Sequence, residues 1–217
     1  FVVAYLVECA HHVAREITLR FRDREVHLIG FPGCYPNDYA QRMMQALCTH
    51  PNVGGALLIS LGCESFNNRL LREQIAETGR PVKSVTIQQV GGTRSAIAEG
   101  EAFIAEHLAA LEAAERVPMK VDELVIGTIC GGSDGTSGIT GNPAAGRAFD
   151  MLIGDGAACI FEETGELIGC EHIMAARAAT PALAGVLEES VAKAARYYAT
   201  LGYGSFAAGN ATGGLTT

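Results

Sequence analysis

The chain has 217 residues, of which 48% are hydrophobic and 18% charged, so it can bury a sizeable core and does not belong to the disordered class. A net charge of −8 without a Lys/Arg cluster argues against nucleic acid or an anionic membrane as a partner, and no apolar run reaches the roughly 18 residues of a membrane span. Seven cysteines without a CxxC pair indicate a reducing compartment, so we expect a cytoplasmic protein.

Apolar strand-like runs alternate with segments of helical period along the whole chain. Strands are predicted at residues 2–7, 26–31, 56–61, 82–87, 124–129 and 157–161, with a further strand-like piece at 167–168. Helices are predicted at residues 11–20, after 38, at 67–77, from 93 to about 116, at 143–152 and at 181–201. Asn37 or Asp38 suits the N-cap of the second helix.

This alternation predicts an α/β fold with a mostly parallel, Rossmann-like sheet that carries helices on both faces. We expect one catalytic-type domain over residues 1–201. Residues 202–217 are rich in Gly, Ala and Thr, and we interpret them as the start of a truncated C-terminal region. The chain begins at Phe1 inside a strand-like run, which predicts a fragment of a longer protein.

The stretch at residues 127–142 (GTICGGSDGTSGITGN) follows directly from a predicted core strand. Glycines permit a close backbone approach, and successive free N–H groups can bind an anion. Cys130, Ser133, Asp134 and Asn142 add ligands or proton-transfer groups. We interpret the stretch as the floor of an active site; the alternative is a mobile Gly/Ser connection.

Cysteines follow four of the first five predicted strands, at Cys9, Cys34, Cys63 and Cys130. The carboxyl ends of strands in one parallel sheet share an edge, so these thiols could hold iron, zinc or an iron–sulfur cluster. Each cysteine alone is more typical of a small buried hydrophobe. Glu64, beside Cys63, could be a ligand, a proton carrier or a neighbour of a helix N-cap.

Two further groups suit a substrate that carries hydroxyl and carboxylate groups. Gln88, at the end of the fourth strand, can hydrogen-bond a hydroxyl, or can be an ordinary polar strand terminus. Gly92, Thr93 and Arg94 open a helix whose free N–H groups can hold a carboxylate or phosphate, although two glycines before a helix form a weak motif. Among six histidines, His172 beside Glu171 is the best general acid/base candidate.

The phrases at residues 51–65, 82–93, 127–146, 163–172 and 209–217 together resemble the altronate and galactarate dehydratase family, which also contains the sulfolactate sulfo-lyase large subunit. The resemblance implies a lyase that removes water, or in one branch sulfite, from a 2-hydroxy acid to give a 2-keto product. It further implies divalent iron or a similar metal, and a small N-terminal domain or partner subunit in a larger protein, which we expect to be a homo-oligomer. Gly135 and Gly141 depart from the sugar-acid dehydratase pattern, so the exact substrate is left open.

The family pattern marks the following positions: Cys34, Cys63, Gln88, Cys130, Ser133, Asp134, Asn142, Glu171 and His172. Our hypothesis is that His172, oriented by Glu171, moves the proton, and that Cys63 and Cys130, with Cys34, hold or adjoin the metal. Ser133, Asp134 and Gln88 would bind substrate hydroxyls. An iron–sulfur cluster with one open iron would supply the same Lewis acid.

Two other classes of function stay open from the residues alone. One is a hydrolase in which Cys63 or Cys130 attacks an acyl carbon beside His172. The other is a non-catalytic module that binds anions or sugar acids within a larger enzyme.

Overall fold

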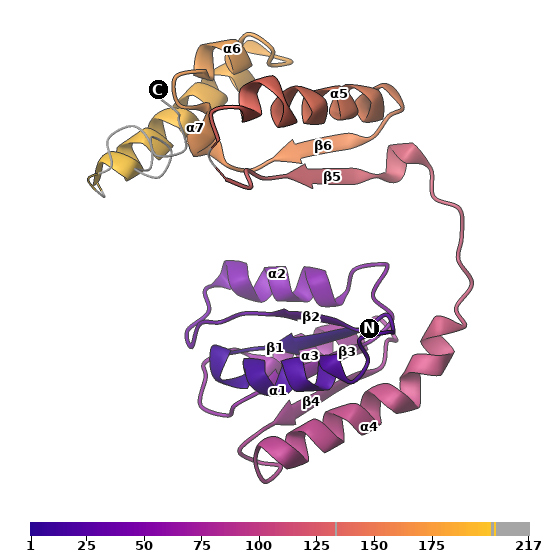
Figure 1. The fold of residues 1–217 in the computed structure, drawn as a ribbon. Helices are drawn as coiled ribbons and strands as arrows, with labels where there is room; N and C mark the ends of the chain where they lie inside the picture. Colours follow the sequence, from indigo (N-terminus) through magenta and orange to yellow (C-terminus); the bar gives the residue numbers. More distant parts are fainter. Residues whose placement is uncertain (133, 201, 203–217) are drawn as a thin grey trace. The chain divides into compact units, whose positions relative to one another are not determined.

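The computed structural model describes residues 1–132, 134–200 and 202, and these form two compact units (Figure 1). Unit 1 is Phe1–Arg116 and unit 2 is Val117–Thr217. Both units contain parallel strands connected through helices, which confirms the predicted α/β class. Among the described residues, no helix has both the length and the apolar character that crossing a membrane requires.

Unit 1 is built on a four-stranded parallel sheet with the order β2-β1-β3-β4. The strands are β1 (Val2–Tyr5), β2 (His27–Gly30), β3 (Ala56–Ser60) and β4 (Val82–Thr86). All five residues of β3 are buried, as expected for a parallel strand with both faces covered. The chain moves outward from β1 to β2 and then returns to the other side at β3. The carboxyl ends of β1 and β3 therefore flank the point at which the strand order reverses, where open α/β sheets bind ligands.

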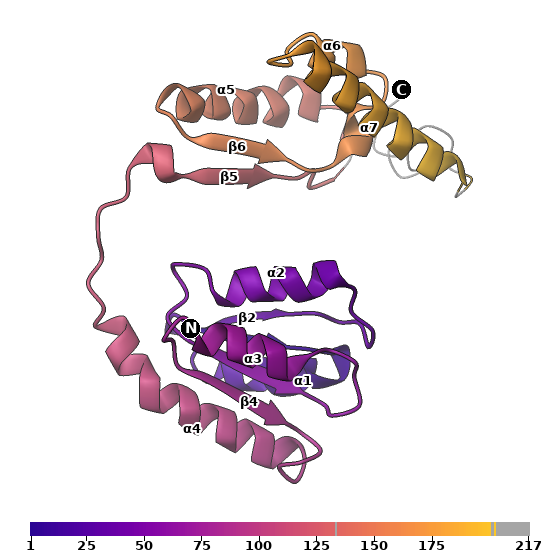
Figure 2. The ribbon, with the colours of Figure 1, turned by 180° about the vertical axis from the view of Figure 1, so that it is seen from behind.

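Helices cover both faces of this sheet (Figures 1 and 2). On one face, α1 (Glu8–Leu19) and α4 (Thr93–Glu112) contact each other and share a core with Leu57 and Ile59 of β3. On the other face, α2 (Asp38–Cys48) and α3 (Asn68–Ala76) share a second core with Leu58. Successive residues of one strand thus enter opposite cores, which is the alternation that extended backbone imposes.

Asparagine side chains fix the starts of two of these helices. Oδ1 of Asn37 accepts a hydrogen bond from the Ala40 N–H (2.9 Å), and Oδ1 of Asn67 accepts one from the Leu70 N–H (3.0 Å). Each bond satisfies a first-turn donor that has no partner within the helix. The expected N-cap at residue 37 is confirmed.

Unit 2 contains a two-stranded parallel sheet of β5 (Val125–Thr128) and β6 (Ala158–Phe161), connected through α5 (Gly141–Gly154). The short 3₁₀ helix η1 (Val121–Glu123) precedes β5, and η2 (Ser137–Ile139) precedes α5. After β6 come η3 (Thr164–Leu167), α6 (Glu171–Ala175) and α7 (Pro181–Thr200).

Three features differ from the sequence-based expectations. The fifth predicted strand, β5, pairs with β6 and not with β1–β4. The sequence could not show this, because strands and helices alternate in the same way whether the strands form one sheet or two. The piece at 167–168 is not a strand: η3 ends at Leu167, and the Ile168 N–H donates to the Gly165 carbonyl instead of a neighbouring strand. The division near residue 116 was not predicted, and the boundary expected at 201/202 adjoins residues outside the described ones and stays a prediction.

Candidate functional site

A cavity of about 620 Å³ lies in unit 2, where the loop after β5 faces the turn after β6. Cys130 and Asp134 line it from the loop, Asn142 lines it from α5, and Glu163 and Glu166 line it from the turn. The carboxyl ends of two parallel strands meet at this cavity, which is the usual position of ligand sites in α/β folds. Three residues expected in the site, Cys130, Asp134 and Asn142, are therefore brought together.

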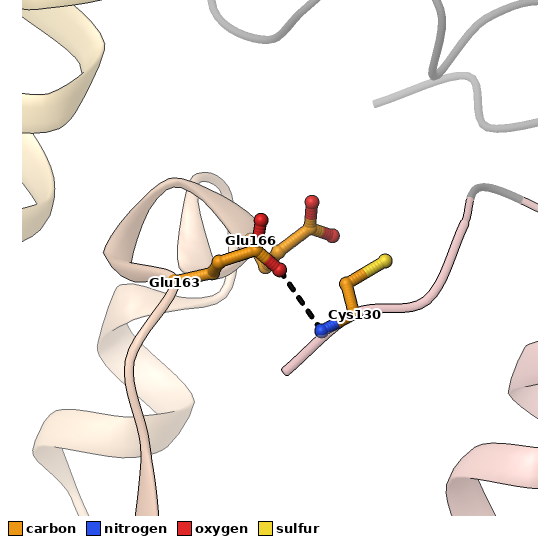
Figure 3. A group of neighbouring side chains, drawn as sticks. All are labelled: Cys130, Glu163 and Glu166. Carbon is orange, nitrogen blue, oxygen red and sulfur yellow. Dashed lines mark hydrogen bonds between the residues drawn. The ribbon is translucent and has the colours of Figure 1, made fainter. Parts of the chain in front are cut away.

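Cys130, Glu163 and Glu166 form a cluster inside this cavity (Figure 3). The Cys130 sulfur and one carboxylate oxygen from each glutamate lie within 4.8 Å of one another. The Cys130 backbone N–H donates a hydrogen bond to Oε2 of Glu163 (3.0 Å), drawn as the dashed line in Figure 3. A thiol with two carboxylates fits a divalent transition metal such as iron or zinc.

Asp134 shapes the glycine-rich loop. Its two carboxylate oxygens accept hydrogen bonds from the backbone N–H and the hydroxyl of Thr136, each at 2.9 Å. These bonds stabilise the charged form, so the pKa of the Asp134 carboxyl lies below its ordinary value, with the bond from the Thr136 N–H as the larger cause. Asp134 therefore presents an ionised acceptor at the cavity rather than a proton donor.

The N-terminus of α5 adjoins the same cavity. Asn142 and Ala145 from its first turns line the cavity, and the preceding residue Thr140 makes no side-chain cap. The first-turn N–H groups and the positive end of the helix dipole favour a negatively charged group at this position. This end of the cavity is therefore suited to a carboxylate.

Glu171 and His172 lie on α6, outside the residues that line the cavity. Oε2 of Glu171 accepts a hydrogen bond from the Gly169 N–H (2.7 Å). That contact holds the start of the short helix. The proposed orientation of His172 by Glu171 stays a prediction, as does the role of Ser133, which lies outside the described residues.

The remaining candidate thiols belong to unit 1. Cys34 and Cys63 are exposed on the loops after β2 and β3, which are joined by a hydrogen bond from the Ser65 N–H to the Cys34 carbonyl (2.9 Å). Cys9 lies in the first turn of α1 rather than at the end of β1. The predicted edge of four thiols in one sheet is wrong, because Cys130 follows a strand of the second sheet. The assignment of Cys34 and Cys63 as metal ligands stays a prediction.

Glu64 is bonded to its own loop. Its Oε2 accepts hydrogen bonds from the N–H groups of Gly62 (2.8 Å) and Cys63 (3.1 Å). Gly62 has a φ of 125°, a backbone conformation that residues with a Cβ rarely adopt, so this position after β3 favours glycine.

The predicted anion-binding residues cluster at the same edge of unit 1. Gln88 follows β4, and Gly92 is the N-cap of α4 with a φ of 98°. Thr93 and Arg94 are exposed in the first turn of that helix. The substrate-binding role of these residues stays a prediction.

Glu163 and Glu166 were not predicted as site residues, although the acidic turn that contains them is evident in the sequence. The available signal was their position directly after the predicted strand at 157–161 in a mostly parallel sheet. Parallel neighbours place their carboxyl ends side by side, so a turn after β6 has to face the loop after β5.

Two family models match this chain, and the boundary between them lies near the boundary between the two structural units. Residues 1–112 match the second domain of D-galactarate dehydratase/altronate hydrolase, and residues 121–217 match the C-terminal region of D-galactarate/altronate dehydratase.

Three curated proteins are similar in sequence. Altronate dehydratase of Bacillus subtilis (strain 168) is 34% identical over 77% of this chain and 34% of its own length. Altronate dehydratase of Escherichia coli (strain K12) is 31% identical over 97% of this chain and 46% of its own length. The beta subunit of (2R)-sulfolactate sulfo-lyase of Chromohalobacter salexigens is 37% identical over 77% of this chain and 44% of its own length. The chain thus spans less than half the length of these relatives.

Proposed function

This chain belongs to the galactarate/altronate dehydratase family, and on that premise we propose that it is part of a metal-dependent hydro-lyase. The enzyme would remove water from a sugar acid or related 2-hydroxy acid to give a 2-keto acid. The observation that carries this proposal is the cavity of unit 2, where Cys130, Glu163 and Glu166 converge beside Asp134 and Asn142.

Cys130, Glu163 and Glu166 would hold the divalent cation, for which we favour iron. Their donor atoms are close enough to share one ion, and the cluster concentrates negative charge that a cation would neutralise. A cation bound there would act as a Lewis acid toward the carboxylate and hydroxyl oxygens of a 2-hydroxy acid. Cys34 and Cys63 are further candidate ligands on the basis of the family resemblance.

The other residues of the cavity would position the substrate. The amide of Asn142 and the N–H groups at the start of α5 can donate hydrogen bonds to a substrate carboxylate. The ionised carboxylate of Asp134 can accept a hydrogen bond from a substrate hydroxyl. Ser133, Gln88, Gly92, Thr93 and Arg94 are additional candidates for binding hydroxyl or carboxylate groups.

β-Elimination also requires a base for the proton on C2 and an acid for the departing hydroxide. We assign this proton transfer to His172 on α6, with Glu171 as its positioning partner. The alternative is a hydrolase in which Cys63 or Cys130 is the nucleophile beside His172. Such an enzyme would stay active without metal, so metal dependence distinguishes the two. A homo-oligomeric assembly with a small N-terminal domain or subunit remains part of the proposal.

The experiment uses the full-length protein and the sugar acids altronate and galactarate, with formation of the 2-keto product as the readout. Turnover should disappear when a chelator removes the metal and return with Fe²⁺. Cys130→Ser should lower both metal content and turnover, whereas His172→Asn should lower turnover and leave the metal content unchanged. Turnover that persists without metal would refute the Lewis-acid proposal, and no turnover of either acid in the metal-loaded protein would refute these substrates.

A further inference from the structure

Unit 2 buries far less apolar surface than unit 1. Among its described residues, the buried hydrophobic side chains are Ala157, Ala175 and Val191, whereas two cores fill unit 1. A unit of this size normally contains one contiguous core. The apolar side chains of unit 2 are present but exposed, so the missing burial has to come from contacts beyond those described.

The exposed apolar side chains include one face of the β5–β6 sheet. Val125 is paired with Ala158, and Gly127 with Ile160, so these four residues project from the same side. Val125 is 62% exposed and Ile160 is 54% exposed. On the opposite side, the paired Ile126 and Cys159 are half-buried. Helix α5 contacts β6 and runs alongside it in both views (Figures 1 and 2).

Parallel sheets are stable when both of their faces are covered, and an isolated two-stranded sheet is marginal in water. The face opposite α5 is apolar, and its two small residues, Gly127 and Ala158, would let a helix approach the strands closely. Among the described residues, β5 and β6 pair only with each other. Within the described part of unit 2, Val125 and Ile160 thus lie on a face of the sheet that is largely exposed.

The relatives are much longer than this chain, so their additional residues are candidates to cover this face. The chain accounts for 34–46% of the length of three of them, so more than half of each such polypeptide lies outside the matched region. A second copy is a poorer candidate, because a four-residue face is far smaller than the 1,200 Å² or more, roughly, of a stable protein interface. We propose that a helix of the full-length polypeptide, outside residues 1–217, packs on the face formed by Val125, Gly127, Ala158 and Ile160. This inference is independent of the proposed reaction.

The test measures thiol accessibility in the native full-length protein. Ile160→Cys and Val125→Cys place thiols on the proposed face, and Val117→Cys serves as the matched control, because Val117 is 80% exposed in the segment before β5. Peptide mass spectrometry distinguishes the new thiols from the native cysteines. Labelling at positions 160 and 125 should be at least about 100-fold slower than at 117, because it requires the covering helix to detach.

A second measurement identifies what covers the face. A photoreactive amino acid at position 160 should form cross-links to residues outside 1–217 of the same polypeptide. Fast labelling at all three positions would overturn the proposal. Cross-links that stay within residues 1–217 would also overturn it, as would cross-links between differently isotope-labelled copies or protection that disappears on dilution.

Discussion

The backbone N–H of Cys130 donates a hydrogen bond of 3.0 Å to Oε2 of Glu163, which lies 33 residues further along the chain. This contact joins the loop after β5 to the turn after β6, so two walls of the cavity are held together. It uses one oxygen of Glu163 and the main chain of Cys130. The thiol is left available as a ligand.

Removing a carboxylate charge from the cluster should weaken metal binding. Glu166→Gln replaces a charged oxygen donor by a neutral amide. We expect the divalent-metal affinity to fall at least about 100-fold, because mutating residues that only support a ligand already lowers metal affinity by about 10- to 100-fold. Glu163→Gln should have a similar effect, while its amide oxygen can still accept the Cys130 N–H. Isothermal titration of the metal-free full-length protein with Fe²⁺ under anaerobic conditions measures both.

The matched control for these variants is Glu162→Gln. Glu162 belongs to the same turn but neither lines the cavity nor belongs to the cluster. The metal affinity of the Glu162→Gln variant should therefore stay within a factor of about 3 of wild type. Equal losses in all three variants would point to the general negative charge of the turn. Wild-type affinity in Glu163→Gln and Glu166→Gln would rule out the cluster as the metal site.

The helices and strands of unit 1 were predictable because each has a local signal. The β3 sequence is a mainly apolar run between Gly55 and Gly62, and Asn37 and Asn67 mark helix starts through their own side chains. The pairing of β5 with β6 had no such signal. Whether a later strand extends the first sheet or begins another depends on contacts distant in sequence, which local patterns do not record.

The same distinction applies to the site. Cys130, Asp134 and Asn142 were found together because one glycine-rich stretch carries all three. Glu163 and Glu166 were missed because they reach Cys130 only through the parallel pairing of two strands. The prediction that four cysteines share one sheet edge was wrong because it required β5 to belong to the first sheet.

The Asp134 carboxyl should titrate at lower pH in wild type than in a variant without the Thr136 hydroxyl. The bonds from the Thr136 N–H and hydroxyl lower the Asp134 pKa, so their contribution to loop order is present above the ordinary Asp pKa and is lost as pH falls through the lowered value. Thr136→Val removes the hydroxyl bond and keeps the N–H bond, so the midpoint should rise. Thr136→Ser should retain the low midpoint, measured by the Asp134 carboxyl ¹³C shift. An unchanged midpoint in Thr136→Val would show that the hydroxyl bond is absent in solution.

The buried thiol of Cys48 should make unit 1 sensitive to alkali. Burial raises its pKa from 9.0 to about 12, so the thiol stays neutral in the folded unit and ionises in the unfolded chain. Its contribution to the free energy of unfolding is constant below pH 9.0 and decreases by up to about 1.4 kcal/mol per pH unit above it. Chemical denaturation between pH 8 and 10.5 should therefore show the stability gap between wild type and Cys48→Ala narrowing as pH rises. A constant gap would contradict the burial of this thiol.

Gly100 is a buried residue of α4 that faces α1 and β3. A Cβ at this position would lie 2.6 Å from Cδ1 of Ile17 on α1 and 2.9 Å from Cδ2 of Leu57 on β3. Gly100→Val therefore overpacks the core between two helices and the central strand, and it should lower the free energy of unfolding of unit 1 by about 1–3 kcal/mol. Hydrogen exchange, which reports each unit separately, measures the change.

The same substitution at Gly185 isolates the packing effect. Gly185 lies in α7, and among the described residues no atom beyond its chain neighbours and the nearby backbone of its own helix lies within 4 Å of the position its Cβ would occupy. Since valine favours the helix over glycine, Gly185→Val should raise helix stability by roughly 0.3 kcal/mol. If the change in the free energy of unfolding has opposite signs for Gly100→Val and Gly185→Val, close packing and not helix propensity requires glycine at position 100. If Gly100→Val were also neutral or stabilising, α4 would lie further from Ile17 and Leu57 than the structure indicates, and the core on that face of the sheet would be looser.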